Sequence, residues 1–156
     1  MSTDDALPFA LTHQVRDTCM CLHLQRAARA VARHYDEALR PLNLTNGQFS
    51  LLMSLNRREA PSVGETSTLL GMDRTTITAA LKPLERRGLL KVRNAAADKR
   101  NRLMTLTPGG RRLLAAAIPL WNRAQGQTGV VVGSDLAAFR AKLRAIASGE
   151  WAESRP

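Results

Sequence analysis

Residues 69–108 read LLGMDRTTITAALKPLERRGLLKVRNAAADKRNRLMTLTP, and a helix pattern changes into a strand pattern within them. Asp73 is a good N-cap, and the apolar residues that follow it recur with helical spacing. We therefore predict a helix from Arg74 to Arg87. Gly88 ends it, because glycine readily takes the left-handed conformation after a helix. The inward-facing positions of this helix are Ile77, Leu81 and Leu84.

A β-hairpin is predicted directly after this helix. Residues 89–93 and 103–106 alternate loosely in hydropathy, whereas residues 94–102 between them are polar and basic. Thr107 and Pro108 then suit the N-cap and the first position of another helix.

Two short helices are predicted before the decisive stretch. Thr45 starts one that ends near Arg58, and Ser62 starts another that ends at a tight turn over residues 71–72. Each of these caps has a Gln or Glu three residues later, which is the pattern of a capping box.

The two ends of the chain are predicted to be helical as well. Apolar steps of three and four favour one long helix from Phe9 to Arg40, closed by Pro41. At about 1.5 Å per residue it exceeds about 40 Å, so we expect part of it to pack on a partner chain. Near the other end, residues 126–133 are glycine-rich and predicted to form a loop, and Ser134 is expected to cap the last helix.

Composition narrows the possible functions. The chain has 156 residues, which suits one domain, and its 23 Lys and Arg against 13 Asp and Glu give a formal charge of +10. Such a charge favours binding to nucleic acid, or second to an anionic membrane surface. No apolar run approaches the length of a membrane helix, and the N-terminus lacks the features of a secretory signal. The two cysteines make no disulfide framework, so we expect the protein in a reducing cytoplasm.

The order of the elements is that of a winged helix-turn-helix, in a fold that is mainly α with a small β-hairpin (α+β). A helix that begins with small hydroxyl side chains can approach base edges closely. The side chains expected to contact bases are Thr75, Thr76 and Thr78. The side chains on the same helix expected at phosphates are Arg74, Lys82 and Arg86. The hairpin side chains expected in a neighbouring minor groove are Lys99, Arg100 and Arg102.

Three segments resemble the MarR family in order and spacing. Residues 44–52, LTNGQFSLL, are similar to its second helix, and residues 71–78 with 84–89 are similar to its recognition helix. Residues 98–100 and 106–111 are similar to its wing and to the start of the next helix.

This resemblance implies a homodimeric regulator, expected to be a repressor, on a pseudo-palindromic duplex operator. Residues 1–44 would be an N-terminal dimerisation helix, 45–106 the DNA-binding region and 107–156 C-terminal dimerisation helices, all in one intertwined domain. Arg100 would enter the minor groove, and Asp98 would orient it.

Cys19 and Cys21 raise the question of what such a regulator senses. Position 21 resembles the reactive cysteine of the family branch that senses organic hydroperoxides, and Tyr35 matches a tyrosine that the other subunit supplies there. Residues 21 and 35 are nearly four helical turns apart and share one face, so two antiparallel helices can bring them together. Inert, buried cysteines are the alternative, because free cysteine is often buried.

Other signals stay open. A small aromatic or acidic ligand would bind between the dimerisation helices and the DNA-binding lobe, and the candidate pocket residues are Leu22, Arg26, Met53 and Trp121. Cys19 and His23 have the i, i+4 spacing of two metal ligands, so a metal- or arsenite-responsive regulator using Cys19 and Cys21 is an alternative. A basic protein that binds DNA without specificity is another. No phosphate loop or catalytic set is present, so we expect no enzyme, no cofactor and no dedicated metal site.

Overall fold

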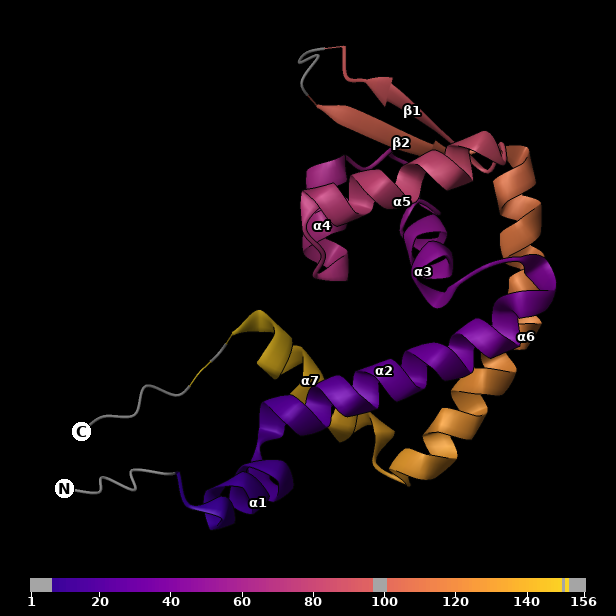
Figure 1. The fold of residues 1–156 in the computed structure, drawn as a ribbon. Coiled ribbons are helices and arrows are strands. Elements are labelled where there is room, and N and C mark those ends of the chain that lie inside the picture. The colour runs from indigo at the N-terminus through magenta and orange to yellow at the C-terminus, as the bar shows by residue number, and fades with distance from the viewer. Residues whose placement is uncertain (1–6, 97–100, 150, 152–156) are drawn as a thin grey trace.

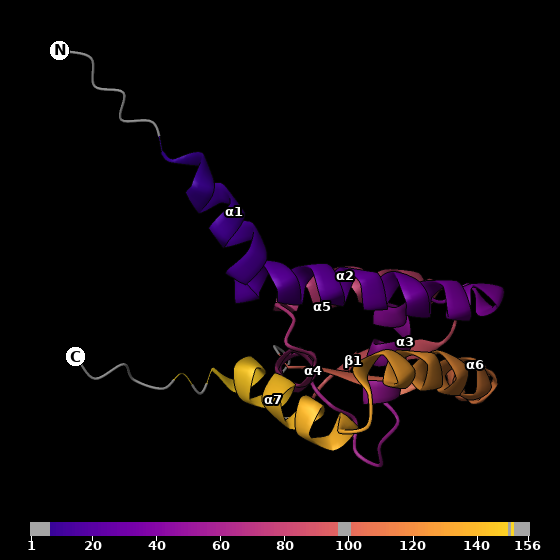
Figure 2. The same cartoon turned by 90° about the horizontal axis from the view of Figure 1, so that it is seen from below.

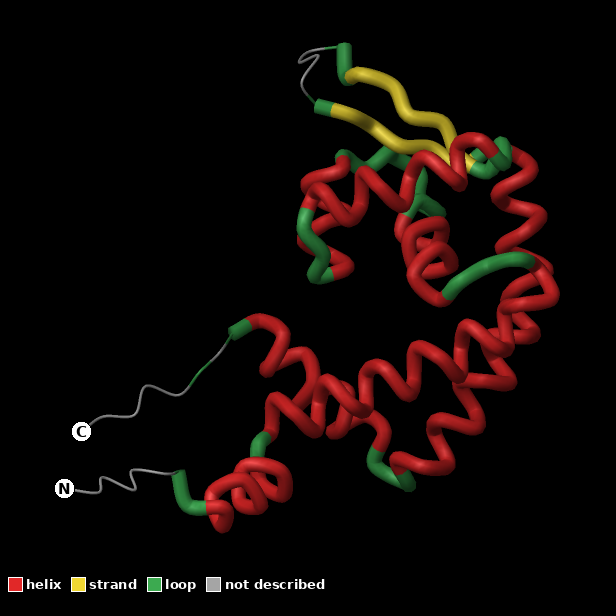
Figure 3. The backbone as a smooth tube through the Cα atoms, viewed as in Figure 1, coloured by secondary structure: helices red, strands yellow, loops and turns green. Residues whose placement is uncertain are grey.

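The computed structural model describes residues 7–96, 101–149 and 151. The described helices are α1 (Phe9–Thr18), α2 (Met20–Leu39), the 3₁₀ helix η1 (Arg40–Leu42), α3 (Asn46–Ser54), α4 (Val63–Leu70), α5 (Arg74–Arg86), α6 (Pro108–Val132) and α7 (Leu136–Ser148). The strands are β1 (Leu90–Asn94) and β2 (Arg102–Leu106), which pair antiparallel. The mainly helical class with a small hairpin is therefore confirmed (Figures 1 and 3).

The fold has two parts. The lobe is α3, α4, α5, β1 and β2, and the arm is α1, α2, α6 and α7 (Figure 1). One hydrophobic core joins them, because Leu39 at the end of α2 and Leu114 of α6 pack with the buried residues of the lobe. The apolar lobe residues with at most 1% exposure are Leu51, Leu52, Ile77, Leu81, Leu84, Leu90 and Met104.

The predicted helix starts are confirmed where they depend on capping. Thr45 and Ser62 both form complete capping boxes with the residue three positions later. Thr107 caps α6 through a bond that its hydroxyl accepts from the Gly110 N–H at 3.0 Å, with Pro108 at the first helical position. Gly88 has φ 68° and follows α5, as expected of a glycine stop.

The hairpin is attached to the start of α4. Its register runs from Leu90 opposite Leu106 to Asn94 opposite Arg102. Ser62 forms an additional antiparallel bridge with Leu103, and the Met104 N–H donates to the Pro61 carbonyl at 3.0 Å. The first residue of β2 therefore lies near the N-terminus of α4.

The prediction of a single helix over residues 9–40 is wrong. The helix is interrupted at Cys19, which has extended backbone angles (φ −69°, ψ 107°) between α1 and α2. The Thr18 hydroxyl donates to the Gln14 carbonyl at 2.8 Å, and the His23 ring Nε2 lies 3.1 Å from the Asp17 carbonyl. These side chains contact carbonyl groups at the end of α1, where the intrahelical pattern stops.

Three other boundaries also differ from the predictions. The helix that starts after Thr45 ends at Ser54 rather than near Arg58. The expected loop over residues 126–133 is almost entirely helical, because α6 continues to Val132. Gly129 faces Leu136, and a Cβ at position 129 would lie 3.4 Å from a Leu136 methyl group. Asp135, not Ser134, caps α7, with its carboxylate accepting from the Ala138 N–H at 3.0 Å.

The arm leaves many large apolar side chains exposed. They lie on and beside α1, at the start and middle of α2, at the end of α6 and on α7: Leu7, Phe9, Leu11, Val15, Met20, Val31, Val130, Val131, Phe139, Leu143, Ile146 and Trp151. Although α2 and α7 overlap in Figure 1, Figure 2 shows that they are separate. Among the described helices, none is both long and apolar enough to cross a bilayer.

Candidate nucleic-acid interface

Helices α4 and α5 are joined by a tight turn that presents the start of α5 to solvent. Gly71 takes the left-handed conformation (φ 62°), which glycine adopts without a steric cost. The Ser67 hydroxyl donates to the Met72 carbonyl and closes the turn. Asp73 then caps α5. The two helices thus form a helix-turn-helix with its second N-terminus exposed.

The cap of α5 engages one of the predicted base-reading residues. The Thr76 N–H donates to Asp73 Oδ1 at 2.8 Å, and the Thr76 hydroxyl donates to Oδ2 at 2.6 Å. These bonds lower the pKa of Asp73, because they stabilise its charged form. The Thr76 hydroxyl proton is therefore engaged by Asp73. Towards DNA this side chain can accept a hydrogen bond through its oxygen or make an apolar contact through its methyl group.

The outward face of α5 carries the remaining predicted contacts. Arg74, Thr75, Thr78, Ala79 and Lys82 line a shallow hollow of about 370 Å³ on this face. All are exposed except Thr78, which is half-buried, and Arg86 is exposed one turn beyond Lys82. The structure therefore places the predicted residues of α5 on one accessible helix.

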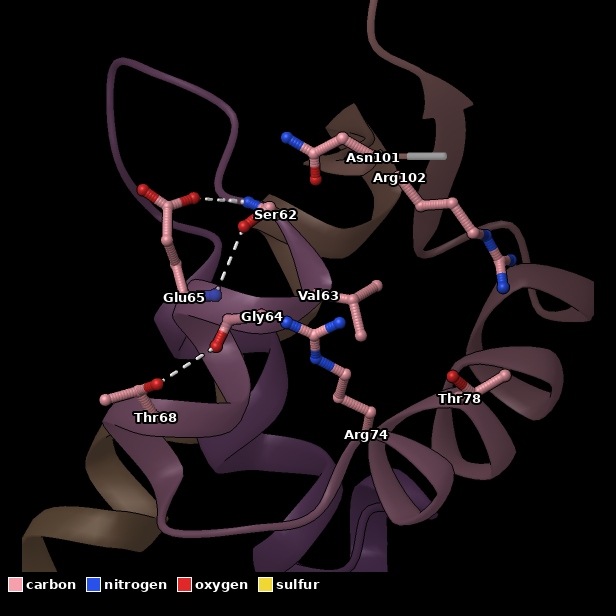
Figure 4. Close-up of a pocket in the computed structure, with 9 residues that line it drawn as sticks. All are labelled: Ser62, Val63, Gly64, Glu65, Thr68, Arg74, Thr78, Asn101 and Arg102. Atoms are coloured by element: carbon pink, nitrogen blue, oxygen red, sulfur yellow. Dashed lines mark hydrogen bonds between the residues drawn. The ribbon is translucent and has the colours of Figure 1, made fainter. Parts of the chain in front are cut away.

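A polar groove of about 540 Å³ lies between α4, α5 and the start of β2 (Figure 4). Arg74 extends from α5 across it, and Arg102 extends into it from β2 (Figure 4). The Arg74 guanidinium lies over Gly64, because a Cβ at position 64 would be only 3.1 Å from Arg74 Nη2. Gly64 thus gives this cation room beside the first turn of α4.

The groove combines features that bind anions. The first backbone N–H groups of α4 have no acceptor within the helix, and the helix dipole is positive at this end. The Glu65 carboxylate accepts from the Ser62 N–H at 2.7 Å, which lowers the pKa of Glu65, and this side chain points away from Arg74 (Figure 4). Arg74, Arg102 and the N-terminus of α4 therefore line one groove, with the Arg74 guanidinium on the side of Gly64 and the Arg102 guanidinium on the side of Thr78 (Figure 4). Cations and a helix N-terminus along one groove suit a phosphate group.

Comparisons with known proteins agree with this geometry. The sequence model of the MarR family matches residues 44–101. The chain is 31% identical over 140 residues to the HTH-type transcriptional regulator TtmR of Methylorubrum extorquens, covering 86% of this chain and 72% of that protein. The chain belongs to the MarR family.

Two further members of this group are informative. The structure of the M. tuberculosis transcriptional regulator MosR in complex with DNA is similar with a TM-score of 0.76 and 34% identity, covering 85% of this chain and 96% of that one. The organic hydroperoxide resistance transcriptional regulator of Bacillus subtilis is 29% identical over 108 residues, covering 69% of this chain and 74% of that protein. These proteins are transcriptional regulators, which confirms that the chain is a regulator rather than an enzyme.

Some MarR-type contacts predicted from the sequence lie outside the described residues. These are Asp98, Lys99 and Arg100 at the hairpin tip. Conversely, sequence reasoning missed Gly64 and Asn101, which line the groove. The capping box at Ser62 did indicate a helix N-terminus here, but its proximity to Arg102 follows from the pairing of residues 61–62 with β2.

The cysteines occupy two different environments in this MarR-family fold. Cys19 is half-buried at the break between α1 and α2, so the expectation that both cysteines lie in one helix is wrong. Cys21 is exposed, and its Sγ accepts from Gln25 Nε2 at 3.1 Å. Tyr35 is buried, and its hydroxyl donates to Gln125 Oε1 of the same chain at 2.7 Å. Among the described residues, no three His, Cys, Asp or Glu side chains gather as a metal site would require.

The predicted ligand-pocket residues separate into two places. Met53 and Trp121 line an apolar pocket of about 390 Å³ between α3, α4 and α6. The rings of Phe49 and Trp121 stack beside it, with centroids 6.3 Å apart. Arg26 instead lies in a basic hollow along α2, and Leu22 is half-buried on the same helix but does not line the apolar pocket.

Proposed function

We propose that this MarR-family regulator is a homodimeric repressor of a pseudo-palindromic duplex operator. The observation that carries the proposal is that Arg74, Arg102 and the N-terminus of α4 line one groove beside the exposed face of α5. This arrangement fits a phosphate of the DNA backbone while α5 lies in the major groove.

Within this proposal the side chains divide by chemistry. Thr75 and Thr78 read base edges, and Thr76 contributes its methyl group or accepts a bond, since its proton is held by Asp73. Phosphates are contacted by Arg74, Lys82 and Arg86. Arg102 was predicted to enter a minor groove, but it lines the same groove as Arg74 and is assigned a phosphate contact instead. At the hairpin tip, Lys99 and Arg100 enter the minor groove, and Asp98 orients Arg100.

The dimer is supported by the apolar surface of the arm. Val130 and Val131 are 82% and 88% exposed, and Phe9 is 72% exposed. A monomer that leaves such side chains in water forgoes the free energy of burying them, about 25 cal/mol per Å² of apolar surface. We propose that a second copy covers this surface, with residues 1–44 and 107–156 forming the dimer contacts around the 45–106 DNA-binding region.

Base reading and phosphate contact are separated by two variants of α5. We expect Thr78→Ala to weaken binding to the operator while leaving binding to random duplex DNA nearly unchanged, because a base contact is worth about 1–3 kcal/mol and only the operator supplies it. Lys82→Ala should weaken both DNAs alike and make the salt dependence shallower. Fluorescence anisotropy on duplex DNA from upstream of the chain's own gene, and on a scrambled duplex, measures this. Equal effects of Thr78→Ala on both DNAs would argue against base reading by α5.

We further propose that oxidation of Cys21 releases the operator. The exposure of Cys21 and the similarity to the Bacillus subtilis regulator support this. The thiolate attacks an oxygen of an organic hydroperoxide, the O–O bond breaks, the alkoxide leaves and takes a proton, and Sγ becomes a sulfenic acid.

The test compares operator binding before and after an organic hydroperoxide at one salt concentration. We expect affinity to fall at least tenfold in the native chain and to be retained in Cys21→Ser, with Cys19→Ser as the matched control that still responds. A native chain that binds equally well after oxidation would instead favour a ligand of the apolar pocket at Met53 and Trp121, since that pocket suits a small aromatic molecule.

A further inference from the structure

Arg87 connects the end of the predicted recognition helix to the end of the arm. It is the residue that follows α5, and its guanidinium turns back towards η1. Nη1 donates to the Asn43 carbonyl at 2.7 Å, and Nη2 donates to the Leu42 carbonyl at 3.1 Å. The Arg87 side chain thus contacts two residues that precede it by 44 and 45 positions in the sequence.

The acceptors of these bonds are the last carbonyls of the α2–η1 segment. Asn43 takes the left-handed conformation (φ 51°, ψ 41°) and ends η1. Carbonyls at a helix C-terminus lack intrahelical donors, and a cation there is favoured by the helix dipole. The planar guanidinium supplies two parallel donors, so it caps the end of the arm helix and orients it at the same time.

The same end of α5 is held from the other side by α6. The Thr107 hydroxyl donates to the Gly88 carbonyl at 2.6 Å, and the Thr107 N–H donates to the Leu89 carbonyl at 3.1 Å. Residues 87–89 therefore lie between the end of α2 and the start of α6. In addition to the shared hydrophobic core, these polar contacts tie the C-terminal end of α5 to the arm.

We propose that Arg87 is a positioning residue that fixes the orientation of α5 relative to α2, and thereby sets the separation of the two recognition helices in the dimer. This inference rests on the proposed function. It assigns Arg87 no DNA contact. The Arg86 side chain, in contrast, makes no hydrogen bond or ion pair within the described part of the chain and is a proposed phosphate contact. Recognition helices must match half-sites one helical turn apart, about 34 Å, so their separation controls operator affinity.

The test compares Arg87→Gln with Arg86→Gln, because both remove one charge from adjacent positions. Binding is measured by fluorescence anisotropy at several salt concentrations on two duplexes. One is the full operator from upstream of the chain's own gene, and the other is a single half-site cut from it. Thermal unfolding midpoints of all variants are recorded alongside.

We expect Arg87→Gln to bind the full operator roughly tenfold more weakly, within the usual range of coupling energies, and to bind the half-site as the native chain does. Its salt dependence stays unchanged, because every phosphate contact remains. Arg87→Gln also discriminates less between half-site spacings, so that its affinity changes less than that of the native chain when one base pair is inserted or removed between the half-sites.

Arg86→Gln weakens binding to both duplexes and makes the salt dependence shallower, by roughly 0.9 for each phosphate that the variant no longer neutralises. Arg87→Lys keeps the positive charge but loses the planar guanidinium with its two parallel donors. We therefore expect it to show part of the Arg87→Gln effect.

Equal reductions in affinity on both duplexes, or a shallower salt dependence for Arg87→Gln, would overturn the inference and make Arg87 a phosphate contact or a residue needed only for folding. Unchanged full-operator affinity in both Arg87 variants would overturn it as well. A native chain that fails to distinguish the operator from scrambled DNA would overturn the proposed function itself, and this inference with it.

Discussion

Gly110→Ala is expected to destabilise the protein by about 3 kcal/mol or more, because the added methyl group would overlap the main chain. A Cβ at this position would lie 2.0 Å from the Leu89 carbonyl oxygen and 3.1 Å from a Leu106 methyl group. The Leu89 carbonyl cannot move away freely, since it accepts from the Thr107 N–H and lies in the segment that joins α5 to the hairpin. Relief of the overlap would displace the start of α6 from the lobe.

Gly109→Ala is the matched control for this prediction. A Cβ at position 109 would meet the Thr107 hydroxyl at 3.5 Å and the Gly88 carbonyl at 3.6 Å, which are ordinary contacts. Alanine is a better helix former than glycine by up to about 1 kcal/mol, so this variant should be neutral or slightly stabilised. Urea unfolding followed by circular dichroism measures both. Similar midpoints for the two variants would show that the segment at Leu89 moves easily.

The largest effect on DNA binding is expected from removing both groove arginines, Arg74→Ala with Arg102→Ala. In a dimer this removes four cations from the interface. At about 1 kcal/mol for each phosphate contact removed, affinity should fall roughly a thousandfold. The slope of log affinity against log salt should become shallower by roughly three to four, since each phosphate contact contributes about 0.9.

Arg111→Ala with Arg112→Ala is the matched control, because it removes the same charge from exposed positions in the first turn of α6. Anisotropy titrations on the operator at four or more salt concentrations give both affinity and slope. If the two double variants lower the affinity equally and with the same slope, the effect is one of net charge and the groove is not a phosphate site.

The sequence predicted the features that depend on neighbouring residues. The caps at Thr45, Ser62, Asp73 and Thr107 follow from side chains that bond to backbone three residues away. The predicted hairpin is confirmed, because the alternation of apolar and polar residues in its sequence is that of a half-buried strand pair.

Features that depend on distant residues were predicted less well. Glycines 126 and 129 indicated a loop, yet α6 continues through them and Leu136 of the following helix packs at Gly129. The break at Cys19 involves Asp17, Thr18 and His23 together, which helical periodicity alone does not reveal.

The candidate site shows the same division. Arg74 and Arg102 were each predicted to contact DNA, but that they line one groove together with the start of α4 depends on the bridge between Ser62 and Leu103. Of the predicted pocket residues, Met53 and Trp121 line one cavity, but Arg26 lines a separate hollow along α2.

The arm contacts α5 at its C-terminal end, whereas the buried Ile77, Leu81 and Leu84 hold the rest of this helix to the lobe, so that α5 and the lobe turn together as a lever. The 13 residues of α5 span about 20 Å, with the arm contacts at residues 87–89 and the threonines proposed to read bases near the other end. A rotation of about 5° at the arm contacts moves the far end by roughly 1.7 Å, which is more than the distance range of a hydrogen bond tolerates. A rotation too small to disturb any single contact with the arm therefore becomes a larger displacement at the threonines proposed to read bases. The length of α5 sets the size of that displacement.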